Sequence, residues 1–262
     1  MCLGLHLLVL EVTGRCNLSC SYCYRGGDSS RDIRDPLRLM DHIAGVNPYI
    51  INLSGGEPLI FNDLFNFAEI VKKTCRKLFL TTNGTLVENF PRNYFKIFDH
   101  IQISLDGGKQ IHEDMRGNGN YEKAINAAKY LKGVSPVSFL CTICSANCHQ
   151  IGEIINVAQE TGAIPKIGRM CGFSHSNFSP ITNPHIWKSI LAESTNCGIL
   201  NDDPLNFWFD EKKKASTNPK RIVGGCTAGI AGVAISPELD VYPCVKLRIP
   251  AGNLKEQSLK DI

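Results

Sequence analysis

Apolar and polar positions along the chain follow two periods, one typical of buried strands and one typical of amphipathic helices. Six apolar runs have strand character, and amphipathic stretches separate or follow them. The strands are expected at residues 7–13, 49–54, 77–82, 100–105, 137–143 and 164–169. The helices are expected at residues 36–44, 63–74, 121–131, 150–161 and 185–194. Strands that alternate with helices in this way indicate a parallel sheet with crossover helices.

The number of these units predicts the kind of barrel. Six β/α units are fewer than the eight of a closed barrel, so the expected fold class is α/β, a partial (β/α)6 TIM-like barrel over residues 1–195. After it, the periodicity lapses into Asn, Asp, Pro and a lysine run, which indicates a solvated linker. Two short apolar runs at residues 230–235 and 241–245, with a turn between them, are typical of a hairpin. We therefore expect a small second domain over residues 196–262.

Composition narrows the class of protein. The chain has 262 residues, of which 43% are hydrophobic and 20% charged, as in globular proteins. A net charge of +3 is slight and gives no argument for nucleic acid or an anionic membrane as the partner. The apolar start is short and lacks a basic n-region, and no run approaches the ~20 apolar residues of a spanning helix. A cytoplasmic protein is expected.

Twelve cysteines are unusual in such a protein, because disulfides are rare where thiols are kept reduced. Metal or cluster chemistry is the better explanation, and three of the cysteines have suitable spacing: Cys16, Cys20 and Cys23 directly follow the first strand. Thiolates favour zinc or iron–sulfur clusters. A structural zinc site needs a fourth ligand, and no suitable companion lies nearby. Three thiolates on a four-iron cubane leave one iron open.

The spacing C-x-x-x-C-x-Φ-C, in which Tyr22 is the aromatic residue Φ, resembles the signature of the radical S-adenosylmethionine superfamily. The resemblance implies that Cys16, Cys20 and Cys23 hold a [4Fe–4S] cluster whose open iron binds S-adenosylmethionine. It also implies a reductant such as flavodoxin or ferredoxin. An electron passed through the cluster then splits the sulfonium C–S bond, and the resulting 5′-deoxyadenosyl radical abstracts a hydrogen from a substrate.

Further motifs match the same family in order. The segments Ser-Gly-Gly-Glu-Pro, Thr-Thr-Asn-Gly and Ser-Leu-Asp-Gly end the second, third and fourth expected strands. Each could be only a turn, but ligands bind at the carboxyl ends of parallel strands. By resemblance, the first two segments lie near the methionine group of the cofactor and the third near its ribose. The expected cofactor contacts are Tyr22, Gly55, Gly56, Glu57, Thr82, Asn83, Ser104 and Asp106.

Two residues are candidates for a catalytic role. Arg116 belongs to a His-x-x-Met-Arg-Gly segment that resembles the family, and it could pair with a carboxylate of cofactor or substrate. A surface arginine at a helix entrance is the alternative interpretation. Cys141 and Cys144 fall on opposite faces of the fifth strand, so one of them is expected in the core. We take Cys144 as the thiol that faces the active site, with simple packing as the alternative.

The tail resembles the SPASM/Twitch extension of radical S-adenosylmethionine enzymes, in which two cysteines flank a hairpin and hold an auxiliary [4Fe–4S] cluster. Cys226 and Cys244 occupy these positions. Leu239 stands where the pattern usually has glycine, and no cysteine follows Cys244, which leaves room for one auxiliary cluster only. Cys171 and Cys197 are the expected remaining ligands.

The resemblance to SPASM/Twitch proteins points to maturation of a ribosomally made peptide by crosslinking, epimerisation or oxidation. Because the chain begins at its first strand, a peptide substrate is expected to need a separate leader-peptide recognition protein or direct leader binding. The alternative within the family is a small-molecule dehydrogenase that acts on a sugar or cyclitol alcohol. The alternative outside it is a non-catalytic iron–sulfur electron carrier, which would need no S-adenosylmethionine pocket.

Overall fold

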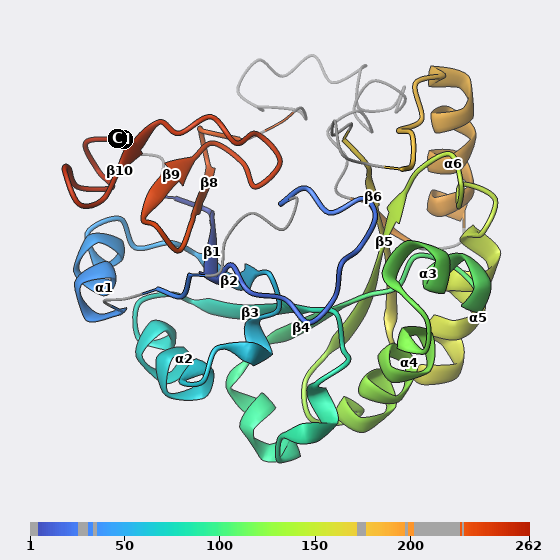
Figure 1. Cartoon of the computed structure of the whole chain (residues 1–262), viewed down its shortest axis with the longest axis horizontal. Helices are drawn as coiled ribbons and strands as arrows, with labels where there is room; N and C mark the ends of the chain where they lie inside the picture. The colour runs from blue at the N-terminus through green and yellow to red at the C-terminus, as the bar shows by residue number, and fades with distance from the viewer. Residues whose placement is uncertain are drawn as a thin grey trace.

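A computed structural model of the chain describes residues 5–25, 31–33, 36–171, 177–196, 199–201, 226 and 228–262. One curved sheet runs through the molecule, and helices cover its outer face (Figure 1). The first six strands are parallel and lie in sequence order. They are β1 (Leu7–Thr13), β2 (Ile50–Gly55), β3 (Lys77–Thr82), β4 (His100–Ser104), β5 (Val137–Ile143) and β6 (Ile164–Arg169). The expected partial barrel is confirmed.

Helices connect these strands and close over the sheet. They are α1 (Pro36–Ala44), α2 (Leu64–Lys72), α3 (Lys109–Arg116), α4 (Asn120–Leu131), α5 (Ile151–Thr161) and α6 (Pro184–Asn196), with short 3₁₀ turns η1 (Pro58–Ile60), η2 (Val87–Asn89) and η3 (Arg92–Ile97). Alternate strand residues such as Leu8, Leu10 and Leu53 are fully buried against them. This apolar layer forms the core, since strand side chains alternate between the two faces of a sheet.

The inner face of the sheet is more polar than its outer face. Asn52, Thr81 and Gln102 project from three neighbouring strands and are joined by side-chain hydrogen bonds of 3.0–3.4 Å. Closed barrels fill this space with layers of branched apolar side chains. Polar groups here indicate a space kept for a ligand.

The tail extends the same sheet. β8 (Gly232–Ile235) pairs in parallel with β1, and β9 (Asp240–Tyr242) returns antiparallel as the expected hairpin. β10 (Gly252–Asn253) and β7 (Leu200–Asn201) complete a ten-stranded order, β10-β9-β8-β1-β2-β3-β4-β5-β6-β7. Figure 1 shows the hairpin, in red, beside β1. The division at residue 196 stays a prediction, because most of the expected linker lies outside the described residues.

Candidate functional site

A cavity of about 540 Å³ opens at the carboxyl ends of the parallel strands. Most of the residues that line it belong to the loop after β1, to β2 to β5, and to two later segments around residues 170 and 245. Loops at this end of a parallel sheet converge on one point, which is why such folds bind ligands there. The cavity is therefore the candidate active site.

The three cysteines predicted to hold the radical cluster, Cys16, Cys20 and Cys23, all line this cavity. Cys16 is exposed, and Cys20 and Cys23 are half-buried in the loop that follows β1. A backbone hydrogen bond of 3.1 Å from the amide of Cys23 to the carbonyl of Cys20 tightens the loop. Burial raises the pKa of Cys16 to about 11 and also raises that of Cys20. Thiols in this setting stay protonated unless a metal binds them, because a coordinated thiol loses its proton.

A cluster fits this donor set better than a single ion does. Among the described residues, no three His, Cys, Asp or Glu side chains converge as ligands of one metal ion. A cubane takes one thiolate at each of three iron atoms, so its ligands stand around a cavity instead of converging on one point. Three soft donors on one short loop match that requirement. The residues present therefore fit a [4Fe–4S] cluster.

Two glycines join the second strand to the cysteine loop. The Gly56 amide donates to the Thr13 carbonyl at 2.8 Å, and the Glu57 amide donates to the Arg15 carbonyl at 2.9 Å. A Cβ at position 56 would lie 2.0 Å from the Arg15 carbonyl oxygen, and one at Gly55 would lie 2.3 Å from that of Thr13. Only glycine permits this approach, so the pair fixes where the cysteine loop sits.

Glu57 is fully buried and does not line the cavity. Its carboxylate accepts hydrogen bonds from the Thr82 hydroxyl at 2.7 Å and from the Asn83 amide at 2.7 Å. Burial raises the pKa of this carboxyl, although the hydrogen bonds oppose the shift. In this arrangement the side chain ties the end of β2 to the end of β3. Its expected contact with the cofactor stays a prediction.

Asp106 also lies behind the cavity wall. Its Oδ2 accepts from Arg116 Nε at 2.5 Å and from the Tyr22 hydroxyl at 2.6 Å, and its Oδ1 accepts from the Thr142 amide at 2.9 Å. The Arg116 guanidinium lies over the Tyr22 ring and reaches within 4.0 Å of Cys20 Sγ. Burial lowers the pKa of Arg116, but Asp106 and Tyr22 outweigh it and leave the pKa raised. Arg116 thus keeps its charge beside the cysteine loop.

His112 supports the same network from α3. The Asp106 amide donates to His112 Nδ1 at 3.2 Å, which leaves the hydrogen on Nε2. Burial lowers the pKa of His112 to about 4, so the ring is neutral at physiological pH. A neutral ring fixes the position of the Asp106 backbone without adding charge to the Arg116–Asp106 pair.

The cavity brings together most of the predicted cofactor contacts and Arg116, but not Cys144, which is the second catalytic candidate. Tyr22, Gly55, Gly56, Thr82, Asn83, Ser104 and Arg116 line the cavity. Both Cys141 and Cys144 are fully buried, and neither lines it. Cys144 packs against Tyr22, Met115 and Met170. Its backbone amide donates a hydrogen bond to Asn147 Oδ1 at 2.8 Å. The buried position of the side chain indicates a packing role.

The predicted auxiliary ligands are only partly described. Cys171 lines the cavity, Cys244 is half-buried and Cys226 is exposed. Cys197 lies outside the described residues. Lys246 Nζ donates to the Arg169 carbonyl at 2.6 Å, which places the loop that carries Cys244 against the segment that carries Cys171. The ligand set stays a prediction.

Sequence reasoning missed a buried ion cluster beside the cysteine loop. Glu11 of β1 is fully buried, and Arg25 and Arg248 both contact its carboxylate. Arg248 Nη1 lies 3.0 Å from each Glu11 oxygen, and the Tyr24 hydroxyl donates to Oε1 at 3.1 Å. This cluster joins the end of the cysteine loop to the tail. A charged residue within an apolar strand was the available signal in the sequence.

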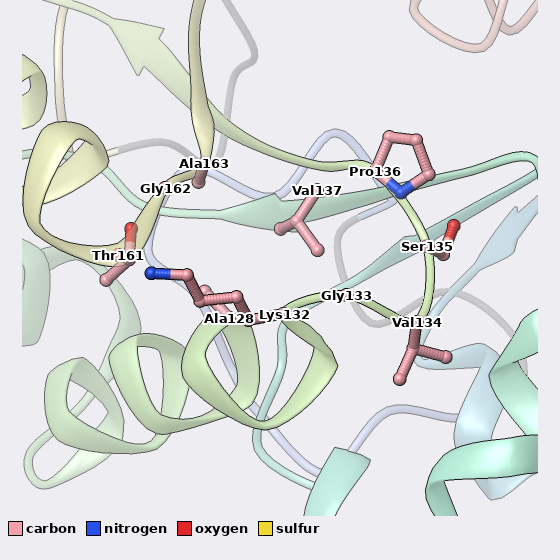
Figure 2. A pocket seen from close by; sticks show the side chains of 10 residues that line it. All are labelled: Ala128, Lys132, Gly133, Val134, Ser135, Pro136, Val137, Thr161, Gly162 and Ala163. Carbon is pink, nitrogen blue, oxygen red and sulfur yellow. The ribbon is translucent and has the colours of Figure 1, made fainter.

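A second hollow, of about 380 Å³, lies at the amino ends of β5 and β6 (Figure 2). Lys132 and turn residues line it, and its described lining holds no Cys, His, Asp or Glu. Figure 2 shows the Lys132 side chain extended towards Thr161 and Gly162. The hydroxyls of Ser135 and Thr161 in this hollow have no His, Asp or Glu beside them in the described lining to act as a general base. The cavity at the carboxyl ends of the strands therefore remains the candidate active site.

No helix in the described part of the chain is both long and apolar enough to span a membrane.

Comparisons with known proteins agree with this geometry. The chain is 25% identical, over 98% of its length and 81% of the relative, to the AdoMet-dependent heme synthase of Methanosarcina barkeri. It is 24% identical to the sporulation killing factor maturation protein SkfB of Bacillus subtilis, over 97% of its length and 63% of the relative. The crystal structure of Streptococcus suis SuiB bound to its precursor peptide SuiA matches all of this chain with a TM-score of 0.80 and 15% identity.

The chain spans just under two thirds of SkfB and of SuiB, with 64% coverage of the latter. The sequence pattern described as the Radical SAM superfamily matches residues 10–158, which is more than half of the chain and includes the cysteine loop and the ends of β2 to β5. That superfamily implies a [4Fe–4S] cluster and S-adenosylmethionine, for which the cavity provides a fitting donor set. The chain belongs to the radical SAM superfamily and is an enzyme that uses S-adenosylmethionine radical chemistry.

Proposed function

We propose that this enzyme modifies a ribosomally synthesised peptide by crosslinking, epimerising or oxidising it. The observation that carries the proposal is that Val245 and Lys246 of the tail line the same cavity as the three cysteines. The tail thus forms part of the site where the radical meets its substrate. Similarity to SkfB over 97% of the chain, and to the fold of SuiB in its peptide complex, supports a peptide as that substrate.

In the proposed mechanism, Cys16, Cys20 and Cys23 hold the cluster. When bound, the cluster supplies the electron that splits S-adenosylmethionine into methionine and a 5′-deoxyadenosyl radical. Gly55, Gly56 and the neighbouring strand ends, which line the cavity, would hold the cofactor. The part of the cavity lined by the end of β5, Met170 and the tail would receive the substrate C–H bond.

We also propose that the tail is a Twitch-like domain with one auxiliary cluster. Cys226 and Cys244 flank the β8–β9 hairpin, as the Twitch arrangement requires. The contact between Lys246 and the end of β6 supports Cys171 as a further ligand, because it places the Cys171 and Cys244 segments side by side. Cys197 would complete the set.

A small-molecule substrate is the rival within this superfamily. The relative from Methanosarcina barkeri is named a heme synthase, and this chain covers 81% of it, against 63% of SkfB. That wider coverage is the observation that supports a non-peptide substrate as the second candidate. The non-catalytic electron carrier has no such support, because the chain belongs to an enzyme family.

A hydrogen-transfer assay separates the two substrate classes. Cells of the organism that encodes the chain are grown in deuterated medium, and their extract is divided into a peptide fraction and a small-metabolite fraction in ordinary water. Each fraction is incubated anaerobically with the reconstituted enzyme, S-adenosylmethionine and dithionite. Deuterium in the 5′-deoxyadenosine from the peptide fraction, abolished by prior protease treatment, is the expected result. Deuterium from the metabolite fraction alone would replace the peptide proposal with its rival. The Cys20→Ala variant is the matched control.

A further inference from the structure

The end of α3 is fixed against the cysteine loop. Ser21, the residue after Cys20, donates two hydrogen bonds to the Met115 carbonyl, from its backbone amide and from its hydroxyl, both at 3.1 Å. Arg116 follows Met115 and is the last residue of the helix. Two hydrogen bonds to one carbonyl leave the helix end little freedom to move relative to the loop. The backbone therefore holds Arg116 beside Cys20.

The three nitrogen atoms of the Arg116 guanidinium have different partners. Nε donates to Asp106 Oδ2 at 2.5 Å, and Nη2 donates to the Tyr22 hydroxyl. Nη1 lies 4.0 Å from Cys20 Sγ. Because a guanidinium is planar and rigid, fixing Nε and Nη2 on their partners also fixes the direction of Nη1. The side chain is thus held with one nitrogen towards the Cys20 sulfur.

Asp106 opposes the positive charge of Arg116 only in part. Arg116 and Cys20 both line the cavity, whereas Asp106 is fully buried and does not. The ion pair therefore presents its positive end to the space in which a cluster would lie. Cys20 also packs against the apolar group formed by Tyr22, Met115, Cys144 and Met170. Such surroundings screen a charge less than water does, so the field of Arg116 at the sulfur stays strong.

A positive charge beside a cluster ligand favours the reduced cluster. Reduction transfers one electron from an external donor to the cluster and breaks no bond, so the cluster gains one negative charge. The net charge around a cluster and the hydrogen bonds to its sulfurs are among the factors that set its reduction potential. Arginine stays charged in proteins, so its effect does not depend on pH. A guanidinium next to Cys20 would therefore raise the potential.

We propose that Arg116 raises the reduction potential of the radical cluster by holding its positive charge beside the Cys20 thiolate. Asp106 and Tyr22 position the guanidinium, and the hydrogen bonds between Ser21 and Met115 position the helix end. Arg116 thereby makes the cluster easier to reduce, which is the step that S-adenosylmethionine cleavage requires. The inference applies to any substrate class and does not rest on the peptide proposal.

A redox titration tests this role without using enzymatic activity. The full chain is reconstituted anaerobically and titrated with dithionite and mediator dyes in the absence of S-adenosylmethionine, and electron paramagnetic resonance measures the reduced cluster at each potential. The signal that changes when S-adenosylmethionine is added identifies the cluster with the open iron. We expect Arg116→Gln to lower the equilibrium constant for reduction of this cluster about tenfold, which is a fall of about 59 mV for one electron.

Two further variants separate the charge of Arg116 from other effects on the potential. Tyr22→Phe disturbs the same hydrogen-bond network but removes no charge, so its shift should be smaller than that of Arg116→Gln. Lys109→Gln removes an exposed positive charge from the same helix and is the matched control. It should leave the potential unchanged, because water and salt screen an exposed charge.

A double variant keeps the test valid if Arg116→Gln does not fold, since that change leaves Asp106 buried without its ionic partner. Arg116→Gln/Asp106→Asn removes both charges and leaves two amides that can hydrogen-bond to each other. A smaller fall of the potential, in the same direction, is expected. Iron per chain is counted in every variant, so that a change of potential is compared only between loaded proteins.

An unchanged potential in Arg116→Gln, or in the double variant if the single one does not fold, would overturn the proposal. If the affinity for S-adenosylmethionine, measured by calorimetry, fell in that case, Arg116 would instead be a contact of the cofactor carboxylate. Loss of iron from both variants would also overturn it, because Arg116 is assigned to the reduction of the cluster and not to its assembly. None of these results bears on the substrate class, which the deuterium assay decides.

Discussion

The two ends of the sheet differ in chemistry more than in shape. At the carboxyl ends, a cavity of about 540 Å³ is lined by three predicted cluster ligands and three cations. At the amino ends, a hollow of about 380 Å³ is lined by one lysine and by turn residues (Figure 2). Both hollows arise where helices and strands connect. The difference shows that a parallel sheet creates concave sites at either end, whereas the residues in its carboxyl-end loops supply the function.

The largest difference between the two ends is expected in iron content and 5′-deoxyadenosine formation, when a glycine at each end is replaced by alanine. Gly56→Ala would place a Cβ 2.0 Å from the Arg15 carbonyl oxygen, so the cysteine loop has to move. We expect iron content and 5′-deoxyadenosine formation to fall by at least an order of magnitude. Gly133→Ala, beside the amino-end hollow, meets no atom within 4 Å and has only its φ of +77° to accommodate, at about 1 kcal/mol. It should keep both readouts, and equal losses in the two variants would contradict the difference.

A smaller difference, in the free energy of unfolding, is expected between variants of two acidic residues, one at each end of the sheet. Asp106→Asn removes the partner of buried Arg116, which should lower the free energy of unfolding by about 3–5 kcal/mol. Asp99, at the amino end of β4, pairs with Lys72 and Lys77 in a partly exposed position. Asp99→Asn should cost about 1 kcal/mol or less. Denaturant unfolding of both variants measures the comparison, and a larger loss in Asp99→Asn would reverse it.

The pH range over which a residue changes the free energy of unfolding should also differ between the two ends of the sheet. The pKa of His112 falls from 6.5 to about 4 on folding, so between these values the unfolded chain binds a proton that the folded chain does not. The free energy of unfolding should therefore decrease by up to about 3 kcal/mol as the pH drops from 6.5 to 4. His112→Asn should remove this dependence. Unfolding curves measured across this range provide the check.

At the amino ends of the strands, the free energy of unfolding is expected to depend on pH in a lower range, which Asp99 sets. Burial opposes the shift, but hydrogen bonds from Lys72 and the Leu78 amide leave the pKa of Asp99 below 3.8. A lowered carboxyl pKa gives stability that is present above 3.8 and is lost as the pH falls through the folded value. Asp99→Asn should thus differ from the wild type in slope only below about pH 4. A slope change near pH 6 in this variant would contradict the assignment.

The smallest effect is expected in the tail hairpin. Leu239 has a φ of +73°, a conformation that strains side chains other than glycine. It is also buried against the core. Leu239→Ala and Leu239→Gly both lose that burial, but only the glycine variant relieves the backbone. We expect Leu239→Gly to be the more stable of the two by about 1 kcal/mol in denaturant unfolding, the reverse of the usual Ala–Gly order.

Local patterns predicted the barrel well because strand and helix periods are local properties. β1, β3, β5, β6 and α1 have the expected bounds. Helix α3 was not predicted, because its short sequence Lys-Gln-Ile-His-Glu-Asp-Met-Arg holds only two apolar residues, Ile111 and Met115. The pairing of β8 with β1 was also not predicted, since this contact joins residues far apart in the chain.

The candidate site shows the same limit. The cysteine spacing is local, so the loop that follows β1 could be assigned from the sequence. The Glu11–Arg25–Arg248 cluster joins three distant segments, and only the fold brings them together. The expectation that Cys144 faces the active site differs from its buried position in the structure for a related reason. Alternation along a strand gives two faces, but the buried turn after β5 encloses Cys144 as well as Cys141.

The central claim is that Cys16, Cys20 and Cys23 hold the cluster that cleaves S-adenosylmethionine. The most direct measurement counts iron and sulfide per chain after anaerobic reconstitution and assays 5′-deoxyadenosine with dithionite, in the wild type and in the Cys16/Cys20/Cys23→Ala variant. We expect about four irons per chain and all 5′-deoxyadenosine formation to be lost in the variant, from a total of about eight irons if the auxiliary cluster is present. Unchanged iron and 5′-deoxyadenosine in the variant would contradict it.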